Sequence, residues 1–164
     1  EAECITERSG PGSEWWMHPQ RVRALADNVA DWAIPLGGIP AWAIESPSFG
    51  SKGPGHDKVL SGWWVVVDHM VAGRGWEPPL RITAAQVKKF ATGKGGGVGT
   101  GKVEVALAIA KRFPDVRLKN DNETDALVIG AIAAAAFGEP FAGTLTKYQQ
   151  EVVDAVRAGA KEEH

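Results

Sequence analysis

Acidic side chains with the spacing of metal ligands precede the apolar segment 126–129. Asp121 and Asp125 are four residues apart, and Asn122 lies three residues before Asp125. On a helix, either spacing brings two side chains to one face, with roughly 5–6 Å between their Cβ atoms. Mg²⁺ prefers oxygen ligands, and two such ions about 3.5–4 Å apart can catalyse phosphodiester cleavage. The segment therefore contains candidate metal ligands.

The same segment also has a structural interpretation. Asn122 at the N-cap with Asp125 at N3 approximates a capping box, and acids in a first turn suit the helix dipole. However, Asp125 leads directly into the apolar run, which favours a position against a buried surface. Both interpretations stay open at this point.

Glu45 is the next candidate. It ends the short apolar run 42–44 and precedes a loop rich in Gly, Ser and Pro. Ligands of open α/β sheets gather at the carboxyl ends of strands, and a carboxylate that is partly desolvated there calls for a cation or a donor. The alternative is an exposed Glu at the end of a strand.

A glycine-rich loop over 92–101 precedes Lys102. Residues 96–102 fit the pattern G-x-x-x-x-G-K of a nucleotide-binding loop. That motif needs Ser or Thr after the lysine and follows a strand. Here Val103 follows Lys102, and the preceding segment predicts a helix, so a P-loop is the weaker interpretation.

Charge is unevenly distributed along the 164 residues. The net charge is −2, but residues 81–112 contain seven basic residues and one acid, a local charge of +6. Such a tract is a candidate phosphate-binding face, although it could equally be the solvated surface of helices.

Hydrophobic periodicity predicts alternating strands and helices. We expect strands at 3–8, 42–45, 80–82 and 116–118, and helices at 19–34, 59–71, 84–91, 102–113, 122–137 and 146–158. This order predicts an α/β fold in one domain covering 1–164, with 146–164 as a C-terminal helical segment. The lone Cys4 and the lack of a signal peptide or membrane-spanning run predict a cytoplasmic protein without membrane association.

The motifs in this order resemble the RuvC-type Holliday-junction resolvases, particularly those of bacteriophages. The resemblance spans roughly residues 40–135 and rests on Ala-Ile-Glu-Ser-Pro at 43–47, Gln-Val-Lys-Lys-Phe-Ala-Thr-Gly-Lys-Gly at 86–95, Lys-Val-Glu-Val at 102–105 and Asp-Asn-Glu-Thr-Asp-Ala-Leu at 121–127. It implies an RNase H-like mixed sheet flanked by helices on both faces. It also implies a homodimer that nicks branched DNA with Mg²⁺ or Mn²⁺ in the cytoplasm of a bacterium or a phage-infected host.

Specific roles follow from this resemblance. Glu45, Asp121 and Asp125 are expected to be catalytic, and together with Asn122 to bind the metal. Lys88 and Lys102 match family lysines that contact DNA near the scissile phosphate. The neighbouring lysines of the basic tract, Lys89 and Lys94, are expected to bind DNA as well.

Two departures from the family pattern define the alternatives. The family opens with a strand that carries a catalytic Asp, and no such strand is present; we expect it upstream of residue 1. Asn122 stands where the family commonly has Asp, so Asp121 or Asn122 is the ligand there. A branched-DNA-binding protein without catalysis is therefore the alternative to a junction-resolving endonuclease.

Overall fold

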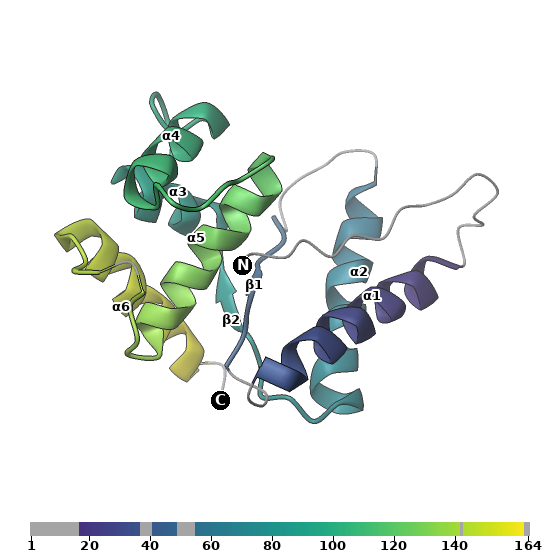
Figure 1. Ribbon diagram of the computed structural model, residues 1–164. Coiled ribbons are helices and arrows are strands. Elements are labelled where there is room, and N and C mark those ends of the chain that lie inside the picture. Colours follow the sequence, from purple (N-terminus) through teal and green to yellow (C-terminus); the bar gives the residue numbers. More distant parts are fainter. Residues whose placement is uncertain (1–16, 37–40, 49–54, 142, 163–164) are drawn as a thin grey trace. The chain divides into compact units, whose positions relative to one another are not determined.

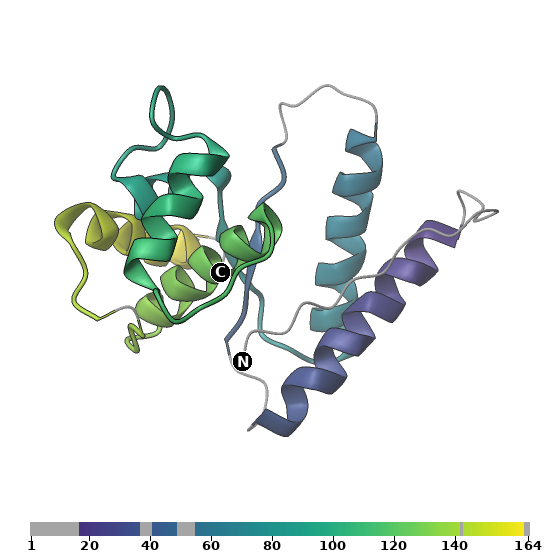
Figure 2. The same ribbon diagram turned by 45° about the horizontal axis from the view of Figure 1, so that its top comes forward.

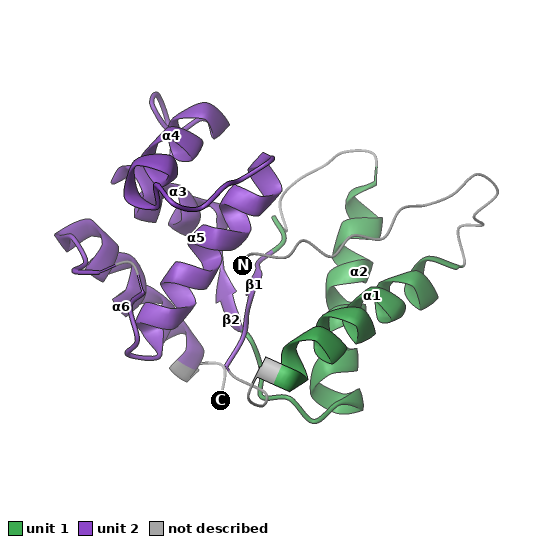
Figure 3. Cartoon of the chain, in the orientation of Figure 1, with its two compact units in different colours: residues 1–40, 47–79 green, residues 41–46, 80–164 purple. Residues whose placement is uncertain are grey.

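The computed structural model describes residues 17–36, 41–48, 55–141 and 143–162. The chain folds into two compact units (Figure 3): unit 1 comprises residues 1–40 and 47–79, and unit 2 comprises residues 41–46 and 80–164. Unit 2 is thus formed from two separate stretches of sequence, and part of unit 1 lies between them. The predicted strand over 3–8 lies outside the described residues.

Unit 1 is built from helices. α1 (His18–Ala33) packs against α2 (His56–Asp68), and a 3₁₀ turn, η2 (Ile34–Leu36), follows α1. The two long helices approach closely at Gly62, where a Cβ would lie 3.3 Å from the His18 ring. The predicted helix over 59–71 is present, but it starts earlier and its last turn is the π-helix η3 (His69–Gly73).

A polar cluster, here called the Asp27 cluster, joins α1 to the first residue of η3 and to Arg74, which follows η3. The Asp27 carboxylate lies 2.8 Å from His69 Nε2 and accepts hydrogen bonds from the Arg74 guanidinium, 3.1 Å from its Nε. Arg74 also reaches Asp31 at 3.3 Å. The pKa of Asp27 is lowered by the hydrogen bond from His69 and then by those from Arg74.

Unit 2 contains a small sheet and four helices. β1 (Ala43–Glu45) and β2 (Leu80–Ile82) pair in parallel, with Glu45 opposite Ile82. The helices are α3 (Ala84–Thr92), α4 (Lys102–Arg112), α5 (Asp121–Ala136) and α6 (Lys147–Glu162). α5 contacts β1 and the other three helices (Figures 1 and 2), so it is the central element of the unit.

The core of unit 2 lies where α5 meets its neighbours. Its buried side chains are aliphatic or aromatic and come from β2 and all four helices; Phe90, Ile109, Ile132 and Val153 are fully buried. One buried polar residue, Gln149, fixes α6 to α3 by donating to the Phe90 carbonyl oxygen at 3.1 Å. The helices that carry the candidate site residues are therefore held on one packed core.

The predicted RNase H-like mixed sheet is wrong. Of the described residues, 66% are helical and 5% are in strands, and these strands form only a two-stranded parallel sheet. The strand expected at 116–118 is an irregular connection between α4 and α5. Val116 and Leu118 are half-buried around an exposed Arg117, and Leu118 packs on the core. The alternation of apolar and polar residues over 116–118 thus arises because a loop packs its apolar side chains inward, and not because the segment pairs as a strand.

None of the described helices combines the length and the apolar character needed to cross a bilayer.

Candidate functional site

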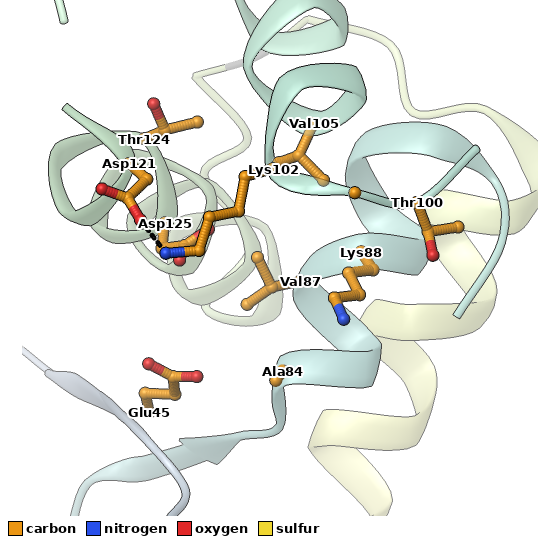
Figure 4. A pocket seen from close by; sticks show the side chains of 11 residues that line it. Glu45, Ala84, Val87, Lys88, Thr100, Lys102, Val105, Asp121, Thr124 and Asp125 are labelled. Atoms are coloured by element: carbon orange, nitrogen blue, oxygen red, sulfur yellow. Dashed lines mark hydrogen bonds and ion pairs between the residues drawn. The ribbon is translucent and has the colours of Figure 1, made fainter. Parts of the chain in front are cut away.

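A pocket of about 300 Å³ lies at the start of three helices and the end of β1 in unit 2 (Figure 4). Five of its lining residues are charged: Glu45 from β1, Lys88 from α3, Lys102 from α4, and Asp121 and Asp125 from α5. The pocket therefore brings together residues that are up to 80 positions apart in the sequence, from Glu45 to Asp125.

The parallel strands determine where Glu45 and α3 meet. Ser46 N donates to the Ile82 carbonyl oxygen at 2.8 Å, so the carboxyl ends of both strands lie side by side. β2 is followed at once by Thr83, which caps α3 in a reciprocal capping box with Gln86. Because α3 starts there, its first residue and Lys88, four residues later, both line the pocket.

The start of α5 differs from the predicted cap. Asn120, not Asn122, is the N-cap, and its Oδ1 accepts from Glu123 N at 2.9 Å. Glu123 in turn accepts from Lys119 N at 2.8 Å. Since Asn120 is the N-cap and accepts from the backbone of Glu123, the predicted cap formed by Asn122 and Asp125 is wrong. Asp125 instead lies with Asp121 on the helix face that lines the pocket.

The glycine-rich loop connects α3 to α4 and leads into Lys102. α3 ends at Gly93, whose φ of 82° favours glycine. Thr100 is buried, and its hydroxyl donates to the Gly97 carbonyl oxygen at 2.8 Å, which anchors the end of the loop. Lys102 is the first residue of α4 and reaches across the pocket toward α5 (Figure 4). A helix, and not a strand, precedes this loop, unlike the loop of a P-loop protein.

Two carboxyls of the pocket have raised pKa values. The pKa of Glu45 is raised by desolvation and then by the negative charge of Asp125. Glu45 has solvent access, but surrounding protein still removes part of the hydration of its carboxyl. The pKa of Asp125 is raised by desolvation and by Asp121, against the opposing effects of Lys102 and Lys88. Two nearby carboxylates that repel each other favour binding of a cation.

Asp121 behaves differently because it pairs with Lys102. Its Oδ2 accepts a hydrogen bond from Lys102 Nζ (Figure 4, dashed line). This contact lowers the pKa of Asp121, with a further contribution from the N–H groups at the start of α5, and raises the pKa of Lys102. The pocket thus contains one neutralised carboxylate and two that face each other.

Three of the residues predicted to bind metal or DNA do not line the pocket. Lys89 lies on another face of α3 and forms an ion pair with Glu151 of α6 at 2.9 Å. Asn122 is exposed on α5, and Lys94 is exposed in the glycine-rich loop. Glu45, Lys88, Lys102, Asp121 and Asp125 are the predicted residues that the structure brings together.

The uncharged residues that line the pocket were not predicted from the sequence. Thr124, which lies between the two aspartates in the sequence, is buried, and its hydroxyl donates to the Asn120 carbonyl oxygen at 3.1 Å. The remaining lining residues are small or apolar: Ala84, Val87, Thr100, Gly101 and Val105. Val87 and Val105 lie three residues after Ala84 and Lys102, so helical spacing could have indicated that they line the same faces. No motif indicated the threonines.

The donor set suits a hard divalent cation. Glu45 and Asp125 offer only carboxylate oxygens, and Mg²⁺ is usually held by one or two carboxylates with water and substrate phosphates completing its octahedron. In the part of the chain that the structure describes, no three side chains of His, Cys, Asp or Glu form a ready metal-binding group. The site would therefore hold the cation through two carboxylates, with water or substrate phosphate oxygens as the remaining ligands.

The comparisons with known proteins do not assign this chain to a family. No family model matches it, and no curated protein or solved structure is detectably similar to it.

Proposed function

We propose that this protein is a DNA endonuclease that hydrolyses phosphodiester bonds with Mg²⁺ or Mn²⁺. The observation that carries the proposal is the convergence of Glu45 and Asp125 with Lys88 and Lys102 in one pocket. The electrostatics support it, because desolvation raises the pKa of both carboxyls, and the charge of Asp125 adds to the shift of Glu45 while that of Asp121 adds to the shift of Asp125. A cation bound at these carboxylates would offset the desolvation and the repulsion that disfavour their charged forms.

Each charged residue has a distinct task in this proposal. Glu45 and Asp125 hold the cation between the end of β1 and the second turn of α5. Lys88 and Lys102 bind the phosphate oxygens as flexible point charges and orient the scissile bond. When bound, the divalent cation supplies a Lewis acid that activates water and neutralises charge on the phosphate.

Branched DNA is the proposed substrate because of the order of the motifs. The segments at 43–47, 86–95, 102–105 and 121–127 resemble, in type and order, the motifs of junction resolvases. In the same proposal the chain acts as a homodimer, which would present two pockets to two strands of a four-way junction. Fold does not fix substrate, so flaps and RNA–DNA hybrids belong in the same assay.

The test is a nicking assay on a labelled four-way junction, a flap, a hybrid and linear duplex, with Mg²⁺, Mn²⁺ or EDTA. We expect cation-dependent nicks with preference for the junction. Asp125→Asn should abolish nicking while it leaves junction binding in EDTA intact. Asp115→Asn, an exposed acid outside the pocket, is the matched control. Nicking by Asp125→Asn at the wild-type rate would contradict the assignment.

A second candidate function is binding of branched DNA without cleavage. The pairing of Asp121 with Lys102 favours it, because this lysine neutralises one of the three pocket carboxylates. It predicts salt-sensitive junction binding and no cation-dependent product at any protein concentration. The same assay therefore distinguishes the two functions.

A further inference from the structure

The contact between Lys102 and Asp121 suggests that the acids of the pocket do not share one task. We propose that Asp121 is a positioning residue, which holds the Lys102 ammonium beside Asp125. The pocket then takes a single divalent cation at Glu45 and Asp125, and Lys102 provides the second positive charge. This inference rests on the proposed function and specifies how many cations the site binds.

The hydrogen bonds of Asp121 support a role other than metal ligation. Its carboxylate accepts from the Lys102 ammonium and interacts with the N–H groups of Asp121 and Asn122 at the start of α5. A cation at Asp121 would have to displace the ammonium and compete with these N–H groups. Asp125, one turn later, is instead destabilised as an anion by desolvation and by the charge of Asp121.

The position of Lys102 relative to Asp125 supports the second half of the proposal. Lys102 interacts electrostatically with Asp125 as well as with Asp121. Figure 4 shows its ammonium at Asp121 with the Asp125 carboxyl beside it. The lysine therefore occupies the side of Asp125 that faces α4, while Glu45 approaches from β1. A second divalent cation bound between the two aspartates would meet the charge of this ammonium.

The pair of Lys102 and Asp121 is accessible to solvent and therefore to a ligand. The Lys102 side chain is 81% exposed and that of Asp121 is 40% exposed. Exposed ion pairs add little to folding stability, and salt screens them. Lys102 can thus turn from Asp121 to a phosphate oxygen without a conformational change of the helices. The ion pair sets the position of the Lys102 ammonium before a phosphate binds, and it contributes little to the stability of the fold.

The first experiment measures cation binding and needs no cleavage. Free Mn²⁺ is determined by electron paramagnetic resonance during titration of the 164-residue chain without DNA. We expect one Mn²⁺ per chain for the wild type. Asp121→Asn should keep that stoichiometry, with a dissociation constant within about threefold of the wild type, whereas Asp125→Asn should weaken binding by more than about tenfold.

The outcomes separate the inference from the proposed function. Two Mn²⁺ ions per wild-type chain, or loss of Mn²⁺ in Asp121→Asn, would overturn the inference and leave the nuclease proposal standing. No Mn²⁺ binding by the wild type, or none of the expected loss in Asp125→Asn, would overturn both.

A second experiment tests whether Asp121 acts through Lys102. Single-turnover nicking rates are compared for Asp121→Asn, Lys102→Met and the double variant, with Lys111→Met, an exposed lysine on α4, as control. If Asp121 positions Lys102, the double variant is no slower than Lys102→Met. Lys102→Arg should recover part of the rate. Independent, multiplying losses would contradict the positioning role.

Discussion

Each of the two units joins carboxylates and basic side chains from separate helices, but the balance of charge differs. In the Asp27 cluster of unit 1, one carboxylate contacts both a histidine and an arginine, and its pKa is lowered. In the pocket of unit 2, Glu45 and Asp125 face each other, and both pKa values are raised.

This contrast separates groups that stabilise the fold from groups that do not. The Asp27 carboxylate accepts hydrogen bonds from His69 and Arg74 in the folded protein, so its ionisation favours folding. Glu45 and Asp125 are less easily ionised when folded, so at neutral pH their charges oppose folding. Residues that a fold retains at a cost to its stability are candidates for function.

The largest expected effect concerns activity. Glu45→Gln should lower the nicking rate by more than the roughly 10–100-fold that is typical of residues which only support a metal ligand. Asp27→Asn, a matched loss of one carboxylate in the other unit, should leave the rate unchanged. Both are measured by single-turnover nicking of the four-way junction. An equal loss in the two variants would show that the contrast between the units does not separate fold from function.

Stabilisation by Mn²⁺ is expected to be intermediate. A ligand at 100 times its dissociation constant stabilises the folded state by about 2.7 kcal/mol, which corresponds to a Tm increase of roughly 5–10 °C for a chain of this size. Thermal unfolding with and without Mn²⁺ should show this shift in the wild type and in Asp27→Asn. Glu45→Gln should lose it, and a full shift in that variant would remove Glu45 from the cation site.

The smallest effect is the pH dependence of stability, which should have opposite signs in the two units. Asp27 has a lowered pKa, so its contribution is present above the ordinary Asp value of about 4 and is lost as pH falls through its folded pKa. Asp125 has a raised pKa, so its charged form destabilises the fold above that raised value. This penalty disappears as the pH falls toward about 4.

Thermal unfolding of two variants between pH 7 and pH 3 measures this difference. At pH 7 without divalent cations, Asp27→Asn should melt below the wild type and Asp125→Asn above it. The gain for Asp125→Asn should stay below about 4 °C, because solvent screens a partly exposed charge. Both differences should shrink near pH 3. A lower Tm for Asp125→Asn at pH 7 would mean that its charge is compensated in the folded protein.

Sequence patterns predicted the helices well because these depend on local signals. Apolar spacing located α1 and α4 to within about two residues, the usual uncertainty of helix ends. The i,i+4 spacing of Asp121 and Asp125 was enough to predict that they share a face of α5. Caps were less certain, since Asn120 and Asn122 both precede an acid by three residues, and only the backbone distinguishes them.

The sheet and the central ion pair could not be predicted in the same way. Alternating burial at 116–118 is the same for a paired strand and for a loop that packs its apolar side chains inward. Hydrogen-bond partners of a strand lie far away in the sequence, so a three-residue run does not specify them. Lys102 and Asp121 belong to different helices, 19 residues apart, and no pattern along one helix can pair them.

The parallel pairing of β1 with β2 has a consequence for how the pocket assembles during folding. Residues 46–79 separate the two strands, so β1 joins the sheet only when a long loop closes, and the entropy of closure grows with loop length. The helices of unit 2 follow one another over 84–162 and can collapse through more local contacts, which form faster. Glu45 should therefore reach Asp125 late, and a pulse of hydrogen exchange should find Ser46 N–H unprotected after α5 is formed.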